Sequence, residues 1–178
     1  MMHSSRRIFK SQTSSQHEIK ELLQALLIGE LIAPSDCLWI VSPWLTDIPL
    51  LDNRSGNISS LEPTWGRKEL YLVEVLKRLM AQGGRLAIVT RPDGHNKTFQ
   101  KRLRLAAADI GKEDNLYVRE RSELHRKGIL SDSFYLSGSM NLTHNGVIRL
   151  DETVMLETEP GKLAEARIAF HDNYGGVE

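Results

Sequence analysis

Amphipathic helical segments alternate along this chain with short apolar runs, and this order limits the possible folds more than any other feature. Helical spacing of apolar residues predicts helices over 17–31, 67–82, 99–110 and 162–174. Apolar and β-branched runs predict strands over 38–41, 86–90, 116–118 and 153–156. The order indicates an α/β domain, an α-β-α sandwich with helices on both faces of a central sheet.

A hairpin is expected within this pattern. Strands over 124–130 and 134–136 flank Ser131, Asp132 and Ser133, which are typical turn residues. Because the two strands would pair antiparallel, the central sheet is expected to be mixed.

The remaining segments divide the chain further. Residues 1–16 are polar and basic and are expected to be a flexible N-terminal segment, with Ser14 or Ser15 near the start of the first helix. Residues 17–178 are expected to form a single domain. Residues 52–63 are rich in Asn, Ser and Gly and are expected to form a mobile loop or insertion.

The predicted hairpin and the residues that follow it carry the pattern HxK(x)4D followed by GSxN. Its members are His125, Lys127, Asp132, Gly138, Ser139 and Asn141. Attack on an anionic phosphodiester requires a neutral nucleophile, positive charge near the phosphoryl oxygens and a proton for the leaving group. Imidazole is the side chain best suited to the first of these roles near neutral pH.

The spacing suggests a role for each residue. On an extended strand His125 and Lys127 would point to the same face and meet the same phosphate. Asn141 would donate to the phosphoryl oxygens, and Ser139 would bond an oxygen or a neighbouring site residue. Gly138 would let the backbone approach the ligand closely, where a Cβ would intrude.

These residues resemble the signature of the phospholipase D superfamily, whose members cleave phosphodiesters through a phosphohistidine. The resemblance implies an orienting carboxylate at Glu152, with Asp151 as its competitor, and it implies that Asp132 supports the site from behind. A turn role alone is the alternative for Asp132. Five residues separate Asp132 from Gly138, whereas many members of the superfamily have six.

The chain has one HxK and no second GSxN. Superfamily enzymes use two such motifs around one phosphate, and short members complete the site as homodimers. The resemblance therefore implies a C2 homodimer in which His125 of each subunit faces the same phosphate. It also implies chemistry without a metal or other cofactor.

Charge gives little support for non-specific coating of nucleic acid, because the formal net charge is zero. Two local basic clusters remain. One consists of Lys97, Lys101, Arg102 and Arg104, for which a solvated helix face is the alternative, and the other of Arg119, Arg121, Arg126 and Lys127. Arg126 is a candidate substrate-binding residue by its place in the motif.

One tryptophan and the scattered histidines are further candidates for the site. Trp44 follows the predicted strand over 38–41 and is expected either to contact substrate or to anchor a loop or dimer contact. The histidines outside the motif lack metal-ligand spacing and are expected at the surface. His144 is expected to line the cleft or occupy an exposed turn.

Cysteine content and the absence of apolar stretches suggest the compartment. The single cysteine, Cys37, lies in an apolar run and is expected to be a buried thiol. No stretch resembles an export signal or a membrane span. The expected location is the cytoplasm.

The favoured function is a metal-independent nuclease that acts on DNA or RNA. The alternative is a nucleic-acid-binding or assembly subunit with little activity alone. Such a subunit would work with partner proteins of a DNA modification, restriction or defence system, including those that insert 7-deazaguanine bases. A lipid phosphodiesterase is less favoured, because no interfacial amphipathic surface is evident and dedicated lipid enzymes of the superfamily usually carry two motifs.

Overall fold

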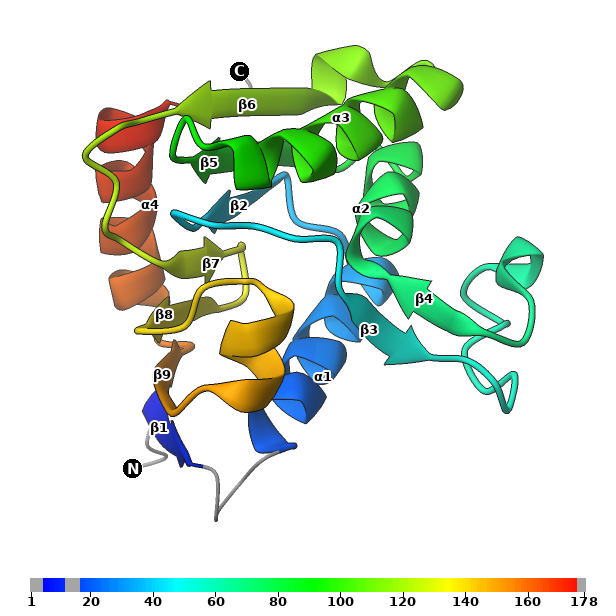
Figure 1. The fold of residues 1–178 in the computed structure, drawn as a ribbon, viewed down its shortest axis with the longest axis horizontal. Coiled ribbons are helices and arrows are strands. Elements are labelled where there is room, and N and C mark those ends of the chain that lie inside the picture. Colours follow the sequence, from blue (N-terminus) through cyan, green and yellow to red (C-terminus); the bar gives the residue numbers. More distant parts are fainter. Residues whose placement is uncertain (1–4, 12–16, 176–178) are drawn as a thin grey trace.

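A seven-stranded mixed sheet forms the centre of the protein (Figure 1). The computed structural model describes residues 5–11 and 17–175. The strand order is β1-β9-β8-β7-β2-β5-β6, in which β2, β5 and β6 are parallel and the other neighbours antiparallel. The strands are β1 (Ser5–Lys10), β2 (Cys37–Val41), β5 (Arg85–Thr90), β6 (Leu116–Glu120), β7 (Gly128–Leu130), β8 (Tyr135–Gly138) and β9 (Glu152–Glu157).

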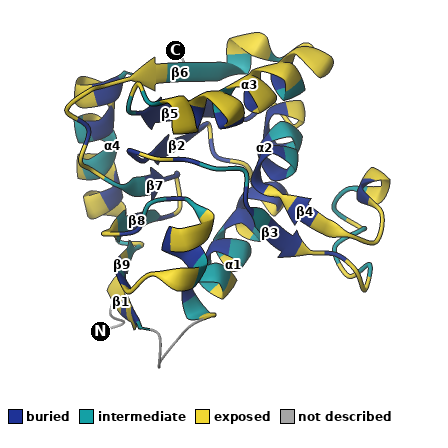
Figure 2. Ribbon diagram, viewed as in Figure 1, coloured by how far each residue is buried: buried dark blue, intermediate teal, exposed yellow. Residues whose placement is uncertain are grey.

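Helices cover both faces of this sheet, which confirms the predicted sandwich. They are α1 (Glu18–Ile32), α2 (Leu72–Ala81), α3 (Gly94–Asp109) and α4 (Pro160–Tyr174). Strand β2 is buried on both faces, and its side chains alternate between two cores. Leu38 and Ile40 face the core that includes α1, α2 and α3, whereas Trp39 packs with Phe170 of α4. Figure 2 shows the buried strands between exposed helix surfaces.

A two-stranded sheet, β3 (Pro49–Asp52) with β4 (Glu69–Tyr71), leads to a segment that projects away from the main sheet (Figure 1). This segment includes the predicted mobile loop, and the structure shows turns built around buried Asn53. The Asn53 amide nitrogen donates to Gly66 O at 2.6 Å, and its Oδ1 accepts from Ile58 N at 3.0 Å.

The prediction of a flexible segment over 1–16 is wrong for Ser5–Lys10, which form β1. The backbone of this strand pairs with β9, from Ser5 opposite Glu157 to Lys10 opposite Glu152. Ile8 and Lys10 are buried. This polar stretch therefore forms an ordered strand, paired with a strand more than 140 residues away in sequence. Residues 1–4 and 12–16, including the proposed helix start at Ser14 or Ser15, lie outside the described residues.

Two element boundaries also need correction. The helix predicted over 67–82 begins only at Leu72, because Leu70 is buried between exposed Glu69 and Tyr71, as in a half-buried strand. The strand predicted over 124–130 begins only at Gly128. Its neighbour β2 ends at Val41, which pairs with Gly128, so the preceding residues have no partner strand. No helix of the described chain is long and apolar enough to cross a membrane.

Candidate active site

Most of the candidate residues lie at one edge of the sheet, because the strand directions bring their ends together. The ends of β2, β5 and β8 meet the beginnings of β7 and β9 at this edge. Loops that follow the carboxyl ends of strands are the usual place for ligands in α/β proteins. The structure therefore places the segments that carry the HxK and GSxN residues beside each other.

His125 is exposed at this edge, where it contacts an arginine from the end of β5. Arg91 Nη2 lies 3.3 Å from both Nδ1 and Nε2 of His125, and Arg91 Nε donates to Leu124 O at 2.9 Å. The contact places a fixed cation beside the imidazole, where its donors could also reach the oxygens of a bound phosphate.

Lys127 lies next to the same edge. Its Nζ donates to His125 O at 2.9 Å, which joins the two ends of the His-x-Lys segment. Lys127 also lines a small cavity of about 20 Å³ together with Ser42 and Gly138, from the ends of β2 and β8. Lys127 therefore lies close to the ends of both strands.

Asn141 is held against the loop after β2. Its Oδ1 lies 3.3 Å from the Ser42 hydroxyl, which also accepts a hydrogen bond from Leu142 N at 3.2 Å. Its amide nitrogen makes no hydrogen bond to a described residue, which leaves both N–H groups for a ligand. The described geometry thus agrees with a donor role for Asn141.

Ser139 and Glu152 form a second polar group at this edge. The Ser139 hydroxyl donates to Glu152 Oε2 and accepts from Thr153 N at 3.0 Å. Glu152 is buried and Asp151 exposed, so Glu152 is the carboxylate that faces Ser139. No hydrogen bond within the described part of the chain joins Glu152 to His125, and Arg91 is the residue that contacts the imidazole ring.

A buried lysine from β1 completes this group. Lys10 is 3% exposed, lies opposite Glu152 in the sheet, and donates from Nζ to Gly146 O at 2.9 Å. Burial lowers the pKa of Lys10, and the carboxylates of Glu152 and Asp151 offset part of this shift. Lys10 thus provides positive charge near Glu152 and fixes the backbone that follows Asn141.

Trp44 lies at the rim, 36% exposed, in the loop after β2. Its Nε1 donates to Asp93 Oδ2 at 3.4 Å, and the Arg91 guanidinium lies 5.3 Å from the indole centre. Asn96 fixes this loop, because its side chain accepts from Leu45 N at 2.8 Å and donates to Pro43 O at 2.9 Å. Arg91 therefore lies against both Trp44 and His125.

Two predicted substrate-binding residues make contacts within the fold. Gly138 has φ of +147°, and a Cβ there would lie 2.0 Å from Thr153 O, so its backbone approaches β9 closely. Arg126 points away from the edge, with its guanidinium 5.7 Å from the centre of the Phe170 ring on α4. Both residues shape or stabilise the fold at these positions.

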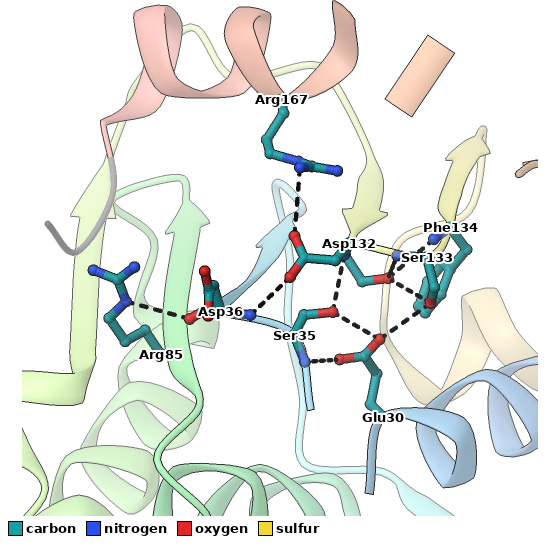
Figure 3. A network of polar contacts seen from close by, with 9 residues as sticks. Glu30, Ser35, Asp36, Arg85, Asp132, Ser133, Phe134 and Arg167 are labelled. Atoms are coloured by element: carbon teal, nitrogen blue, oxygen red, sulfur yellow. Dashed lines mark hydrogen bonds and ion pairs between the residues drawn. The ribbon is translucent and has the colours of Figure 1, made fainter. Parts of the chain in front are cut away.

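Asp132 lies at the opposite end of the sheet, in the turn between β7 and β8 (Figure 3). Its carboxylate accepts from Asp36 N at 2.8 Å and pairs with Arg167 at 3.6 Å, and its own N–H donates to Ser35 Oγ at 2.9 Å. Buried Glu30 accepts from the same serine. The structure does not bring Asp132 together with His125, and its contacts agree with the alternative of a turn residue.

Arg91 and Lys10 are the main residues that sequence reasoning missed. Arg91 follows a predicted strand directly, and the carboxyl end of a parallel strand was the available signal for a ligand-facing residue. Lys10 had no comparable signal, because it lies in a polar stretch whose pairing with β9 is not visible in the local sequence.

Sequence comparisons do not place the chain, since no family model and no curated protein matches it. Solved structures do resemble it. Nuc from Salmonella typhimurium, a phospholipase D family member, matches with a TM-score of 0.57 and 16% identity over 97% of this chain and 95% of Nuc. NucT from Helicobacter pylori matches with a TM-score of 0.56 and 13% identity over 97% of this chain and 98% of NucT.

A third similar structure is phosphatidylserine synthase from Haemophilus influenzae. Its TM-score is 0.59 at 14% identity, over 96% of this chain and 38% of the synthase. At these identities the likeness concerns the fold. The predicted α/β sandwich with a mixed sheet is confirmed as a phospholipase D-like fold.

Proposed function

We propose that this protein is a phosphodiesterase that cleaves DNA or RNA, with His125 as its nucleophile. The observation that carries the proposal is the contact between Arg91 and the exposed imidazole of His125, beside Lys127. The described site offers an imidazole as nucleophile and two cations at one edge. The structural likeness to Nuc and NucT supports a nuclease, because 98% of NucT and 95% of Nuc are covered, against 38% of the synthase.

In the proposed first step an imidazole nitrogen of His125 attacks phosphorus. A P–N bond forms while the P–O bond to the leaving group breaks, and the leaving oxygen takes a proton from a second imidazole. Water then attacks phosphorus and gives its proton to that second imidazole, and the P–N bond breaks. Atoms and charge balance without an oxidant or a metal.

The remaining residues stabilise charge in this scheme. Lys127 and Arg91 would bind the phosphoryl oxygens, with Arg91 moving its donors from the imidazole to the phosphate. The free amide N–H groups of Asn141 would donate to the same oxygens. Ser139 and Glu152, with buried Lys10 near them, would hold the backbone on either side of Asn141.

The second imidazole would come from His125 of the partner subunit in a C2 homodimer. This part of the proposal rests on the single HxK in the chain and on the exposure of His125. Because His125 is exposed at the edge of the sheet, the same residue of a second subunit could approach it. A two-fold axis would place the two identical sites together.

A cleavage assay tests the proposal. Purified protein is incubated with single- and double-stranded DNA and RNA, in parallel with His125→Ala and with His171→Ala, a control at an exposed histidine of α4. Loss of the nucleophile is expected to lower kcat by about a thousandfold or more. The control is expected to keep wild-type activity.

The same assay in EDTA tests the chemistry. Activity is expected to persist, because the scheme draws all of its positive charge from side chains. Equal cleavage by the wild type and His125→Ala, or activity lost in EDTA and restored by Mg²⁺, would contradict the proposed mechanism. Binding without cleavage would favour the nucleic-acid-binding or assembly subunit.

A further inference from the structure

A cleft of about 560 Å³ opens beside the candidate active site. Asn141 forms part of its wall, and other residues around it include Trp44, His95, His144, Asn145 and Leu150. These come from the loops after β2 and β8, the first turn of α3 and the π-helix at Asn145–Arg149. The cleft therefore begins where the proposed function places the scissile phosphate.

The lining of this cleft combines polar and apolar groups. The described residues around it provide an indole, two imidazoles, amide and hydroxyl groups and one leucine, with no Lys, Arg, Asp or Glu among them. A phosphate group would need cations, and an acyl chain would leave the amide and hydroxyl groups of the lining without partners. A flat, neutral group with hydrogen-bonding edges suits this lining.

Trp44 offers a fixed platform for such a group. Its indole is held at Nε1 by Asp93 and on its ring by the Arg91 guanidinium, while Asn96 fixes the loop that carries it. Aromatic side chains held in this way bind nucleobases by stacking, whatever the base. Trp44 is also the most exposed tryptophan, at 36%, against 6% for Trp39 and 8% for Trp65.

We propose that this cleft binds an unpaired nucleobase next to the scissile phosphate, so that the substrate enters as a single strand. This inference rests on the proposed function and specifies its substrate class. In a duplex the faces of a base are stacked and its hydrogen-bonding edge is paired, so a paired base cannot meet Trp44 and the polar lining together.

The exposed surface of α3 provides a path for the neighbouring phosphates. His95, in the first turn of this helix, lines the cleft, and Lys97, Lys101 and Arg104 follow at helical spacing. The three basic side chains belong to exposed residues, and none forms an ion pair with a described residue. The net charge of the chain is zero, so a polyanion would be attracted by these three local charges and not by the charge of the whole protein.

Binding is measured in a His125→Ala background, so that the substrate stays intact. Fluorescence anisotropy of a labelled single-stranded oligonucleotide compares this protein with variants that also carry Trp44→Ala, Trp44→Phe or Phe9→Ala. Phe9 is an exposed aromatic residue on β1 and serves as the matched control. We expect Trp44→Ala to weaken Kd by about 5- to 150-fold, the usual range for one stacked base. Trp44→Phe should retain most of the affinity, and Phe9→Ala all of it.

An abasic substrate locates the base. Removing the base beside the cleaved phosphate is expected to weaken binding to the His125→Ala protein. The same removal is expected to cause little further loss of affinity when the protein also carries Trp44→Ala. Replacement of Lys97, Lys101 and Arg104 by Gln is expected to reduce the slope of log K against log salt by about 2. Independent effects of the abasic site and Trp44→Ala would overturn base binding in the cleft.

The outcomes separate this inference from the proposed function. If cleavage depends on His125 but the Kd for the oligonucleotide is the same with Trp or Ala at position 44, base binding in the cleft would be contradicted. The proposed nuclease activity would still stand. Binding that depends on Trp44, without cleavage dependent on His125, would support the cleft and contradict the nuclease. Equal affinity for a blunt duplex and a single strand would overturn the single-strand assignment.

Discussion

Arg91 is the residue through which the described site is organised, since it contacts the imidazole of His125 and the ring of Trp44. Its planar guanidinium can donate two hydrogen bonds to one phosphate, which the ammonium of lysine cannot do in the same geometry. A lysine at position 91 would therefore keep the positive charge but lose the geometry of the guanidinium.

Arg91→Ala is expected to lower kcat/KM for an oligonucleotide by about a hundredfold or more, as for other donors that stabilise a transition state. Arg91→Lys should restore only part of the loss, because it supplies the charge without the fork. Steady-state kinetics with both variants provides the measurement. Wild-type kcat/KM in Arg91→Ala would contradict a role for this residue at the phosphate.

Lys10→Met is expected to destabilise the protein by about 1–3 kcal/mol, because Gly146 O loses its hydrogen bond in a buried place. Burial lowers the pKa of Lys10 in the folded state, so the unfolded state binds more protons between the lowered pKa and the ordinary value. The free energy of unfolding contributed by this group therefore rises as pH increases through that window.

Urea unfolding at several pH values up to the ordinary lysine range measures this contribution. The difference in unfolding free energy between the wild type and Lys10→Met should grow with pH. A difference that is constant over the window, or that shrinks, would contradict a lowered pKa for Lys10.

Sequence reasoning predicted the candidate residues that belong to one contiguous motif, and most of them lie at one edge of the sheet. The resemblance implied that Asp132 supports the site from behind, with a turn role as the alternative, but β7 separates its turn from that edge. The roles of Arg91 and Lys10 depend on pairings between distant strands. Local spacing contains no information about such pairings.

The turn between β7 and β8 provides a test of this correction. Asp132→Asn is expected to lower the unfolding free energy by about 0.5–2 kcal/mol, through weaker contacts to Asp36 N and Arg167. The kcat of the folded protein should remain at the wild-type value. A large loss of kcat without loss of stability would return Asp132 to the catalytic set.

At the scale of the strands, Gly138 determines how closely β8 can approach β9. Gly138→Ala would place a Cβ 2.0 Å from Thr153 O at a positive φ, and we expect destabilisation of about 3 kcal/mol or more. The contact between Ser139 and Glu152 should be lost with it, and activity should fall.

Gly29→Ala is the matched control, because a Cβ there would meet no atom within 4 Å inside helix α1. It is expected to stabilise the protein by about 0.5–1 kcal/mol. Thermal or chemical unfolding of both variants measures the effect. Equal stability of the two variants would show that the close approach of β8 to β9 is not required.

The long elements could be predicted because their periodicity is local. Helices α1, α3 and α4 and strands β2 and β5 have apolar residues at helical spacing or in short continuous runs. Strands β1 and β4 contain few apolar residues and exist through pairing with β9 and β3. Pairing with a neighbouring strand determines whether such short strands form more than the β-propensity of their residues does.

At the scale of the whole molecule, the proposed chemistry needs two imidazoles at one phosphate. His144 is the rival to His125 of the partner subunit, since it lines the cleft beside Asn141 in the same chain. The two arrangements differ in stoichiometry. A site shared by two chains holds one phosphate per dimer, whereas a site within one chain holds one per subunit.

Counting the covalent intermediate tests the central proposal most directly. The protein is denatured in alkali during turnover of the oligonucleotide that it cleaves best, and the phosphoramidate adducts are located and counted by mass spectrometry. We expect the adduct on His125 in at most half of the chains, and none in His125→Ala. An adduct on His125 in nearly every chain would contradict the shared site. Turnover with no adduct on His125 would contradict the proposed nucleophile.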